Sequence, residues 1–309
     1  PVRTLDEVRS LPELTDTALD PIREAVAATV DMLGSTPLIG FAGAPFTVAA
    51  YMVEGGPSRD HLRPRTMMHA DPVAWRELAQ WAARTSGQFL RAQIEAGASA
   101  VQLFDSWAGS LGEADYRRYV QEHSATALSM VEEFGVPRIH FGTGTAELLP
   151  AMHEAGADVI GVDYRLPLDE ANRRLNGAVP LQGNIDPALL AAGRETLYAH
   201  ADEVLAAGVS APAHIVNLVR IFENDGEVSG IGGRITVCGG VLLLLRMGEG
   251  AQEGKEGLPD RLVVKGTLEH DSAAGPDDGG AFNVDFLLRV MRKVRLSRVV
   301  MVVTMMPCD

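Results

Sequence analysis

Lysine is almost missing from this chain of 309 residues, which holds only three, all after residue 218. The first 218 residues carry 16 arginines and 28 acidic residues, and the whole chain has a formal net charge of −14. Nucleic-acid binding depends on clustered cations that face the phosphates. The first two hundred residues contain no such cluster, so the sequence argues against nucleic acid as a partner.

Cysteines and long apolar runs are also scarce. The two cysteines, Cys238 and Cys308, have no spacing typical of a disulfide framework or a C-x-x-C metal site, so we expect no metal and a reducing, cytoplasmic location. The longest apolar runs, 241–245 and 299–303, are far too short to span a membrane, and the amino-terminal residues show no targeting pattern. The sequence begins at Pro1 rather than at methionine, and we expect its natural start to be missing or processed away.

The composition changes near residue 218. All three lysines, both cysteines and 14 of the 32 glycines follow it, whereas all three tryptophans precede it. We therefore predict a body, residues 1–218, and a divergent tail, residues 219–309, that is poorly ordered or frameshifted. Within the tail, the stretch 248–280 is typical of a flexible linker, and 282–306 is consistent with a helix followed by a strand.

The body alternates short apolar, β-branched runs with helical patterns. Strands are predicted at 36–43, 98–106, 136–142, 157–164, 179–186 and 213–218, and helices at 71–96, 113–134, 146–154, 168–175 and 187–207. Parallel neighbours need a crossover of about a dozen residues, which a helix supplies. The order therefore predicts an α/β fold with a parallel sheet.

A closed barrel is favoured over a doubly wound sheet. No predicted strand is followed by G-x-G-x-x-G with a later acid, so dinucleotide binding has no support. The special residues instead follow the strand ends, as Ser106 and Tyr164 do, and barrel active sites are built at those ends. With two of eight strands missing, we expect open edges at the first and last strands. Such edges invite misassociation and poor solubility unless something covers them.

Three separated motifs carry a resemblance to a known family. GFAGAPFTVAAYMVEGG at 40–56, QLFDSWAGSLG at 102–112 and LQGNIDP at 181–187 resemble uroporphyrinogen decarboxylase, and the similarity runs nearly continuously over 1–218. In that family the corresponding strands are the third to eighth of the barrel, which agrees with the six predicted here. The resemblance implies an incomplete TIM-type (β/α)8 barrel with about six of its eight βα units.

The resemblance also implies an activity. The family removes four acetate carboxyl groups from uroporphyrinogen to give coproporphyrinogen, in porphyrin and haem biosynthesis, without a cofactor and commonly as a homodimer. Protonation of a pyrrole carbon makes the ring an electron sink, so carbon dioxide can leave and the carbanion-like centre that results is then reprotonated. The protein must supply a positioned acid and groups that complement the eight substrate carboxylates.

Two substrate-contacting positions carry over from the family, Tyr51 and Ser106, whose hydroxyls are predicted to donate to substrate carboxylates. The family's paired arginines and central aspartate lie on strands that would precede Pro1. Its eighth strand continues as N-L-G-H-G, where this chain reads Val219 and Arg220 after Leu218. No catalytic residue is assigned as a result, and we expect turnover by this chain to be impaired.

Other functions stay open. The chain is alternatively an inactive relative that binds a tetrapyrrole or a partner subunit. A corrinoid-dependent methyltransferase of the same superfamily is a further alternative, but it would need a zinc site with an H-x-C pair, and here the comparable strand reads His140-Phe141-Gly142. The tail is either the product of a frame change or a true appended module.

Several polar residues have plainer interpretations. Asp105, next to Ser106, is expected to be structural, and the glycines of 142–145 are expected to make a turn rather than a phosphate site. His140 and His214 fall inside strands and are predicted to be core histidines. The other six histidines are predicted to lie on the surface.

Overall fold

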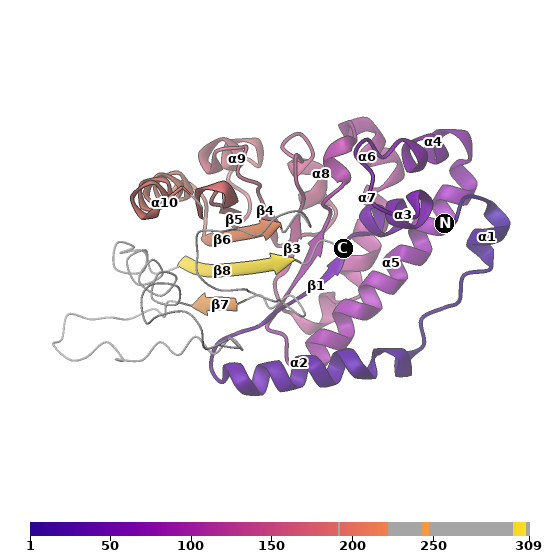
Figure 1. Cartoon of the computed structure of the whole chain (residues 1–309), viewed down its shortest axis with the longest axis horizontal. Helices are drawn as coiled ribbons and strands as arrows, with labels where there is room; N and C mark the ends of the chain where they lie inside the picture. The colour runs from indigo at the N-terminus through magenta and orange to yellow at the C-terminus, as the bar shows by residue number, and fades with distance from the viewer. Residues whose placement is uncertain (191, 222–242, 247–298, 307–309) are drawn as a thin grey trace, which may run out of the picture.

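The computed structural model describes residues 1–190, 192–221, 243–246 and 299–306. Six parallel strands form the centre of the molecule, and each pairs with the next one along the chain (Figure 1). They are β1 Ile39–Gly43, β2 Ala100–Phe104, β3 Arg138–Phe141, β4 Val159–Gly161, β5 Leu181–Asn184 and β6 His214–Ile221. All six predicted strands are confirmed, and β6 runs three residues further than expected.

The strand order and the two faces of the sheet identify a barrel-type fold. A doubly wound sheet reverses its strand order and carries helices on both faces, whereas here the order β1 to β6 is sequential. One face packs on the helices in the main core cluster, through residues such as Leu103 and Ile160. The other face holds a small cluster of strand residues only, Ile39, Ala100, Ile139 and Val159, with Ile215 packed on it.

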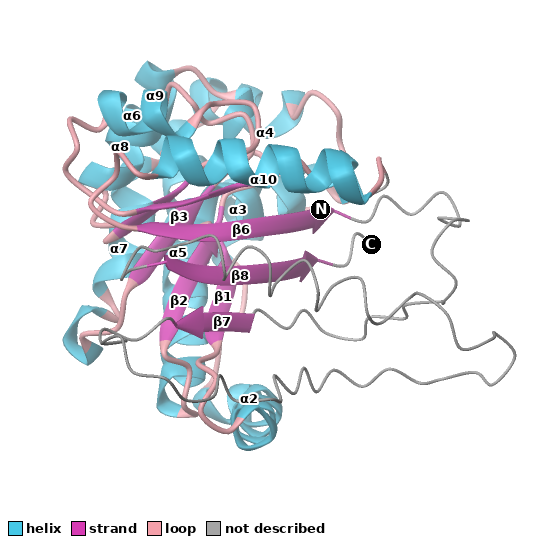
Figure 2. Cartoon of the chain, turned by 90° about the vertical axis from the view of Figure 1, so that its left-hand side faces the viewer, coloured by secondary structure: helices cyan, strands magenta, loops and turns pink. Residues whose placement is uncertain are grey.

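Helices and short 3-10 turns connect the strands and cover the outer face (Figure 2). They are α1 Leu5–Arg9, η1 Asp16–Leu19, α2 Asp20–Leu33, α3 Pro45–Glu54, α4 Leu62–Ala70, α5 Pro72–Glu95, η2 Ala108–Ser110, α6 Glu113–Tyr119, α7 Gln121–Ser129, η3 Glu132–Phe134, α8 Leu149–Glu154, α9 Leu168–Arg174, η4 Pro187–Leu190 and α10 Arg194–Gly208. No helix in the described part of the chain is both long and apolar enough to cross a membrane.

Helix α5 begins as its sequence predicts. The Asp71 side chain accepts a hydrogen bond from the Ala74 amide at 3.0 Å, and Pro72 occupies the first turn, where its missing N–H costs nothing. Two other helix predictions were wrong in extent. The helix predicted over 113–134 is interrupted at Val120, whose backbone is not helical. The one predicted over 187–207 is divided by Gly193, which has a φ of 95°.

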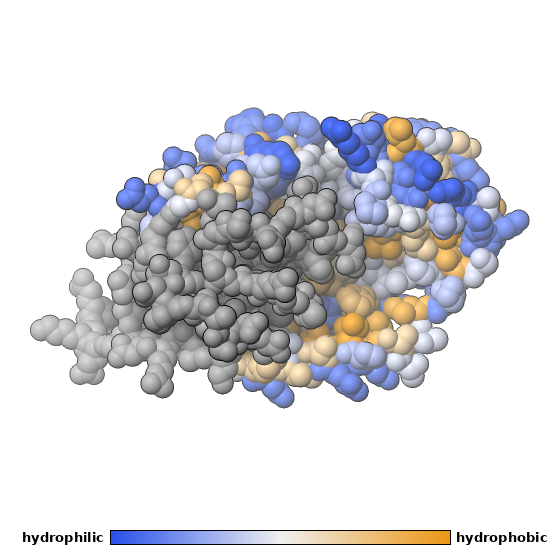
Figure 3. All heavy atoms as spheres, in the orientation of Figure 1, coloured by the Kyte–Doolittle hydropathy of each residue, from blue (hydrophilic) through white to orange (hydrophobic). Residues whose placement is uncertain are grey.

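Helix α2 runs along the lower edge of the molecule and was not predicted (Figure 1). It has no buried residue, although Val30 lies against Gly97 in the turn that leads into β2. In the surface view, apolar side chains gather in the lower middle of this face, beside α2 (Figure 3). The helix therefore adds half-buried apolar surface rather than core.

Two strands of the predicted tail belong to the sheet. β8 Val299–Met306 pairs parallel to β6 along eight residues, and β7 Leu243–Arg246 pairs antiparallel to β8. The edge of the last barrel strand is therefore covered, because β8 pairs with β6 on the side that faces away from β5. The strand predicted within 282–306 is confirmed as β8. The linker predicted at 248–280 and the helix predicted before β8 lie outside the described residues.

Candidate active site at the carboxyl ends of the strands

Aromatic side chains line the inner face of the sheet near the carboxyl ends of three strands. Phe41 follows Ile39 by two residues and Phe141 follows Ile139 by two, so both share the inner face with that cluster. Phe104 lies between them, with edge-to-face contacts at centroid distances of 5.7 Å to Phe41 and 5.8 Å to Phe141. The inner face thus offers an apolar aromatic surface below the loops that follow the strands.

Tyr51 lies on α3, the helix that follows β1. Pro45 at the first helical position and Gly55 in the left-handed conformation after the last turn mark the ends of this helix. The Tyr51 side chain is 42% exposed, although the face of α3 that carries Phe46 and Ala50 is fully buried. The helix therefore presents its tyrosine to solvent at the end of the barrel where active sites are built.

Ser106 is the second residue after β2, in a loop that is hydrogen-bonded to the loop after β3. Its carbonyl accepts a hydrogen bond at 2.7 Å from the Thr143 hydroxyl, in the loop after β3. The Ser106 hydroxyl itself has no hydrogen-bond partner within the described part of the chain. The loop is therefore fixed through its backbone while the serine side chain keeps its hydrogen-bonding capacity.

Trp107 brings the two predicted site residues together. The Tyr51 ring stacks on its indole at a centroid distance of 3.8 Å and 19° from parallel, and the His61 ring stacks at 4.1 Å and 17°. Two nearly parallel rings this close to one centroid would overlap if they shared a face, so they lie on opposite faces of the indole. The residue next to Ser106 is thereby held between Tyr51 and His61.

His61 was predicted to be a surface residue, and that prediction was wrong. It is 8% exposed, and burial lowers its pKa below the ordinary value of 6.5, so the ring is neutral at pH 7. His123, 4% exposed, is a second error of the same kind. The prediction of a hydrogen-bonded core histidine is confirmed for His214, which is buried with its Nε2 atom 2.7 Å from the Gly183 carbonyl oxygen. His140 is also buried, but neither of its ring nitrogens has a hydrogen-bond partner among the described residues.

Asp105 is fully buried between the sheet and the helices. Its Oδ2 atom lies 3.5 Å from Nε2 of His140, which is also fully buried. Tyr116 lies in the same region, and burial, followed by the nearby Asp105 charge, raises its pKa well above the ordinary value. A carboxylate with no exposed surface does not reach a ligand in the barrel mouth, which agrees with the structural role expected for Asp105.

The loops after β3 and β4 are joined by Asp163. One of its carboxylate oxygens accepts from the Gly144 amide and, at 2.7 Å, from the Arg165 guanidinium. Gly144 has a φ of 69°, and the Thr145 hydroxyl donates to the Gly142 carbonyl at 3.0 Å. The prediction of a turn at 142–145 is confirmed.

A small pocket opens beside this turn, at the carboxyl ends of β3 to β6. Phe141 and Thr143 line it together with Tyr164, Asn184 and Asn217. Tyr164 is 40% exposed, and the Arg165 guanidinium covers its ring at 4.5 Å from the centroid. Polar and aromatic groups thus converge at the strand ends, as expected for a ligand site of a barrel.

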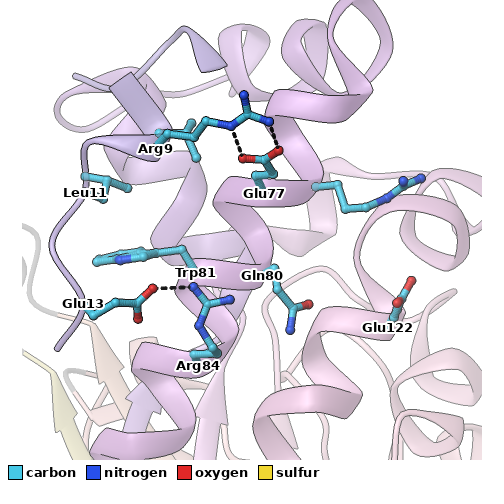
Figure 4. A pocket seen from close by; sticks show the side chains of 10 residues that line it. Arg9, Leu11, Glu13, Glu77, Gln80, Trp81, Arg84 and Glu122 are labelled. Atoms are coloured by element: carbon cyan, nitrogen blue, oxygen red, sulfur yellow. Dashed lines mark hydrogen bonds and ion pairs between the residues drawn. The ribbon is translucent and has the colours of Figure 1, made fainter. Parts of the chain in front are cut away.

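A larger hollow lies elsewhere, between α1 and the outer side of α5 (Figure 4). Arg9 makes two hydrogen bonds to Glu77, of 2.9 and 2.6 Å, and Arg84 pairs with Glu13 at 2.8 Å. The Trp81 indole donates to the Pro12 carbonyl at 3.0 Å. These contacts fasten the amino-terminal segment to α5, so we assign the hollow a structural role.

Sequence reasoning missed Thr47, His61 and Trp107 as parts of the site. Trp107 lies inside the FDSWAG motif, and Thr47 precedes Tyr51 by four residues, a spacing that places both on one face of a helix. Helix α3 was not predicted, because its apolar, partly β-branched sequence gives no clear helical period. Among the described residues, no group of three or more histidine, cysteine, aspartate or glutamate side chains is placed to hold a metal ion.

Comparison with known proteins assigns the family. The family model described as uroporphyrinogen decarboxylase (URO-D) matches residues 1–219. The chain belongs to the uroporphyrinogen decarboxylase family. The resemblance carried by the three motifs is therefore confirmed, and the match includes Tyr51, Ser106 and the loops of the site.

Relatives named uroporphyrinogen decarboxylase come from several bacteria. The protein from Arthrobacter sp. (strain FB24) is 70% identical over 218 residues, which are 71% of this chain and 63% of that protein. The protein from Leifsonia xyli subsp. xyli is 56% identical over 238 residues, covering 70% of this chain and 63% of the relative. The chain thus spans less than two thirds of the length of these family members.

A solved structure supports the fold. A methyltransferase from Methanosarcina mazei superposes with a TM-score of 0.59 over 68% of this chain and 62% of its own, at 18% sequence identity. At that identity the likeness concerns the fold alone. It agrees with a barrel-type arrangement of the family's strands and helices.

Proposed function

We propose that this protein acts in the decarboxylation of uroporphyrinogen, with the Tyr51 and Ser106 hydroxyls donating hydrogen bonds to substrate carboxylates. The observation that carries the proposal is the stacking of Tyr51 on Trp107. It connects the helix that carries Tyr51 to the loop that carries Ser106, two separate family motifs, and so supports a shared binding surface. Hydrogen bonds to ionised carboxylates are among the stronger ones in proteins, so two such donors can orient the substrate.

The inner face suits the rest of a tetrapyrrole. The rings of Phe41, Phe104 and Phe141 provide apolar contact for the macrocycle, while its carboxylates extend toward polar groups at the strand ends. Decarboxylation of an acetate side chain requires protonation of a pyrrole ring carbon, loss of carbon dioxide, protonation of the methylene carbon that remains, and release of the first proton from the ring. The part of this chain assigned here to the site binds and orients the substrate, and no organic or metal cofactor enters the proposal.

Binding without turnover is a second candidate, favoured by the state of the aspartates near the site. Asp105 is buried against His140, Asp163 is engaged by Arg165 and the Gly144 amide, and Asp186 accepts from the Ala188 amide at 2.9 Å. Each of these three carboxylates already has a structural role.

One experiment separates the two candidates. The purified chain is incubated with uroporphyrinogen under reducing, anaerobic conditions, and the loss of carboxyl groups is followed by chromatography of the oxidised porphyrins. Appearance of seven- to four-carboxyl products supports decarboxylation. Binding with no product supports the second candidate, and absence of both contradicts the proposal.

We infer a cytoplasmic location and a homodimer for the functional protein, as the family resemblance implies, and sedimentation equilibrium tests the dimer.

We also infer that 1–218 and 219–309 are distinct parts of the chain. The composition change at 218 and the end of the family match at 219 support that division. Translation of the encoding DNA in its other two frames tests a frame change: a Gly-His-Gly continuation after Leu218 supports it, and its absence favours an appended module.

A further inference from the structure

The hydroxyl of Thr47 joins helix α3 to the loop after β2. Its Oγ1 atom donates to Oδ1 of Asp105 at 2.9 Å and accepts from the Trp107 amide at 3.3 Å. Asp105 and Trp107 are the two residues on either side of Ser106. A single buried hydroxyl on α3 is therefore bonded to the side chain of the residue before the serine and to the backbone amide of the residue after it.

Tyr51 stands four residues after Thr47 on the same helix. Residues at that spacing lie one above the other on one helix face. The distance from Thr47 to Tyr51 is set by the helix, and the distance from Thr47 to Ser106 is set by the two hydrogen bonds. Together these constraints define where the Tyr51 and Ser106 hydroxyls lie relative to each other.

The surroundings of Thr47 explain why a hydroxyl is needed there. Thr47 is 8% exposed and Asp105 is fully buried, with its second carboxylate oxygen facing His140. An apolar residue of the same shape would leave the Asp105 oxygen and the Trp107 amide without this partner, in a place where water does not replace it. We expect the loop to move toward a position that satisfies these groups, carrying Ser106 and Trp107 with it.

We propose that Thr47 is a positioning residue that sets the spacing of the Tyr51 and Ser106 hydroxyls for two carboxylates of one tetrapyrrole. This inference rests on the proposed function, since it assumes that both hydroxyls bind substrate carboxylates. Thr47 touches no ligand in this arrangement and acts through the other two residues. Its contribution is therefore visible only while both hydroxyls are present.

The test uses the full chain and uroporphyrin, the fluorescent oxidised form of the substrate, as the probe. Thr47→Val keeps the side-chain shape and removes the hydroxyl. We expect it to raise Kd about three- to tenfold, roughly the value of one ordinary hydrogen bond, because the two substrate donors are displaced but not removed. Thr47→Ser keeps the hydroxyl, and we expect its Kd to stay within about twofold of the native value. If Thr47→Val does not fold, Thr47→Cys, which has a weak donor, takes its place with the same expectation.

A double-mutant cycle distinguishes positioning from general loosening of the structure. In a Tyr51→Phe, Ser106→Ala background, we expect Thr47→Val to change Kd by less than about twofold, because the groups it positions are gone. An equal weakening in both backgrounds overturns the inference, as does a native Kd in Thr47→Val. If the native chain binds no uroporphyrin, the proposed function and the inference both fail. Binding by the native chain with no effect of Thr47 overturns the inference alone.

Discussion

The Tyr51 ring lies 3.8 Å from the Trp107 ring, centroid to centroid, and this contact connects α3 to the loop that carries Ser106. The other face of Trp107 is covered by His61 at 4.1 Å. The position of the tyrosine hydroxyl thus depends on an aromatic residue in a different motif. This dependence makes the stack itself a target for substitution.

Replacement of Trp107 by leucine is expected to weaken tetrapyrrole binding. Loss of a stacked aromatic pair costs about 0.5–1.5 kcal/mol, which corresponds to about a two- to twelvefold rise in Kd. Trp107→Phe retains a flat ring and should restore most of the affinity. Trp81→Leu, in the hollow on the outer side of α5, is the matched control and should leave the Kd for uroporphyrin unchanged. Equal effects of Trp107→Leu and Trp81→Leu would contradict a specific role for the stack.

Two glycines close to Ser106 offer a second comparison. A Cβ on Gly109 would lie 2.2 Å from the Thr143 carbonyl oxygen, whereas a Cβ on Gly112 would meet nothing within 4 Å. Gly109→Ala therefore forces the loops after β2 and β3 apart, at a cost of about 1–3 kcal/mol for overpacking. We expect Gly109→Ala to lower the urea midpoint and raise the Kd for uroporphyrin. Gly112→Ala should keep both close to native, and a native Kd in Gly109→Ala would show that Ser106 is placed independently of this contact.

Stability is expected to fall in mild acid because of buried histidines. Burial lowers the pKa of His214 below 6.5, against the opposing effect of its hydrogen bond to Gly183, and burial also lowers the pKa of His61 and of His123. Since the unfolded chain takes up protons more readily than the folded one, the contribution of these histidines to the free energy of unfolding is fully present above pH 6.5. This contribution is lost as the pH falls through the lower pKa values of the folded chain.

Urea unfolding at a series of pH values between 7.5 and 5 measures this effect. His214→Gln should flatten the fall in the unfolding free energy, because glutamine does not take up a proton. His69→Gln, which replaces a side chain that is 55% exposed, serves as the control and should leave most of the fall in place. A pH dependence that is identical in the native chain and in His214→Gln would contradict the assignment.

The pairing of β8 with β6 makes a prediction about association. A chain that ends at residue 298 lacks β8, and it leaves the edge of β6 opposite β5 without the partner that covers it along eight residues. Exposed strand edges promote intermolecular pairing, so light scattering should show larger, concentration-dependent species for this truncation. A chain that ends at residue 306 retains β8 and is the matched control. Indistinguishable scattering from the two truncations would show that β8 does not protect the edge.

The strands were predictable from sequence, and several helix boundaries were not. Short apolar runs bounded by glycine, proline or aspartate located all six strands from β1 to β6, because buried parallel strands are almost continuously apolar. Helix α3 escaped prediction because nearly all of its faces are apolar, so no helical period stands out. The break at Val120 separates α6 from α7, which packs against α5, and no glycine or proline marks it in the local sequence.

Some residues of the candidate site were likewise predictable from the sequence, and others were not. Tyr51 and Ser106 were found because they lie in motifs shared with a family. Thr47 and His61 were missed because their roles arise from contacts with Asp105 and Trp107, which lie 58 and 46 residues away along the chain. Such contacts follow from the closure of the fold rather than from local residue patterns.

The affinity of the chain for uroporphyrin, compared with that of a Tyr51→Phe, Ser106→Ala variant, tests the proposed site most directly. Each hydrogen bond to an ionised group contributes about 1.5–3 kcal/mol, so we expect the double variant to bind at least about a hundredfold more weakly while melting at a near-native temperature. A Kd equal to that of the native chain would contradict the assignment of the two hydroxyls to the tetrapyrrole carboxylates.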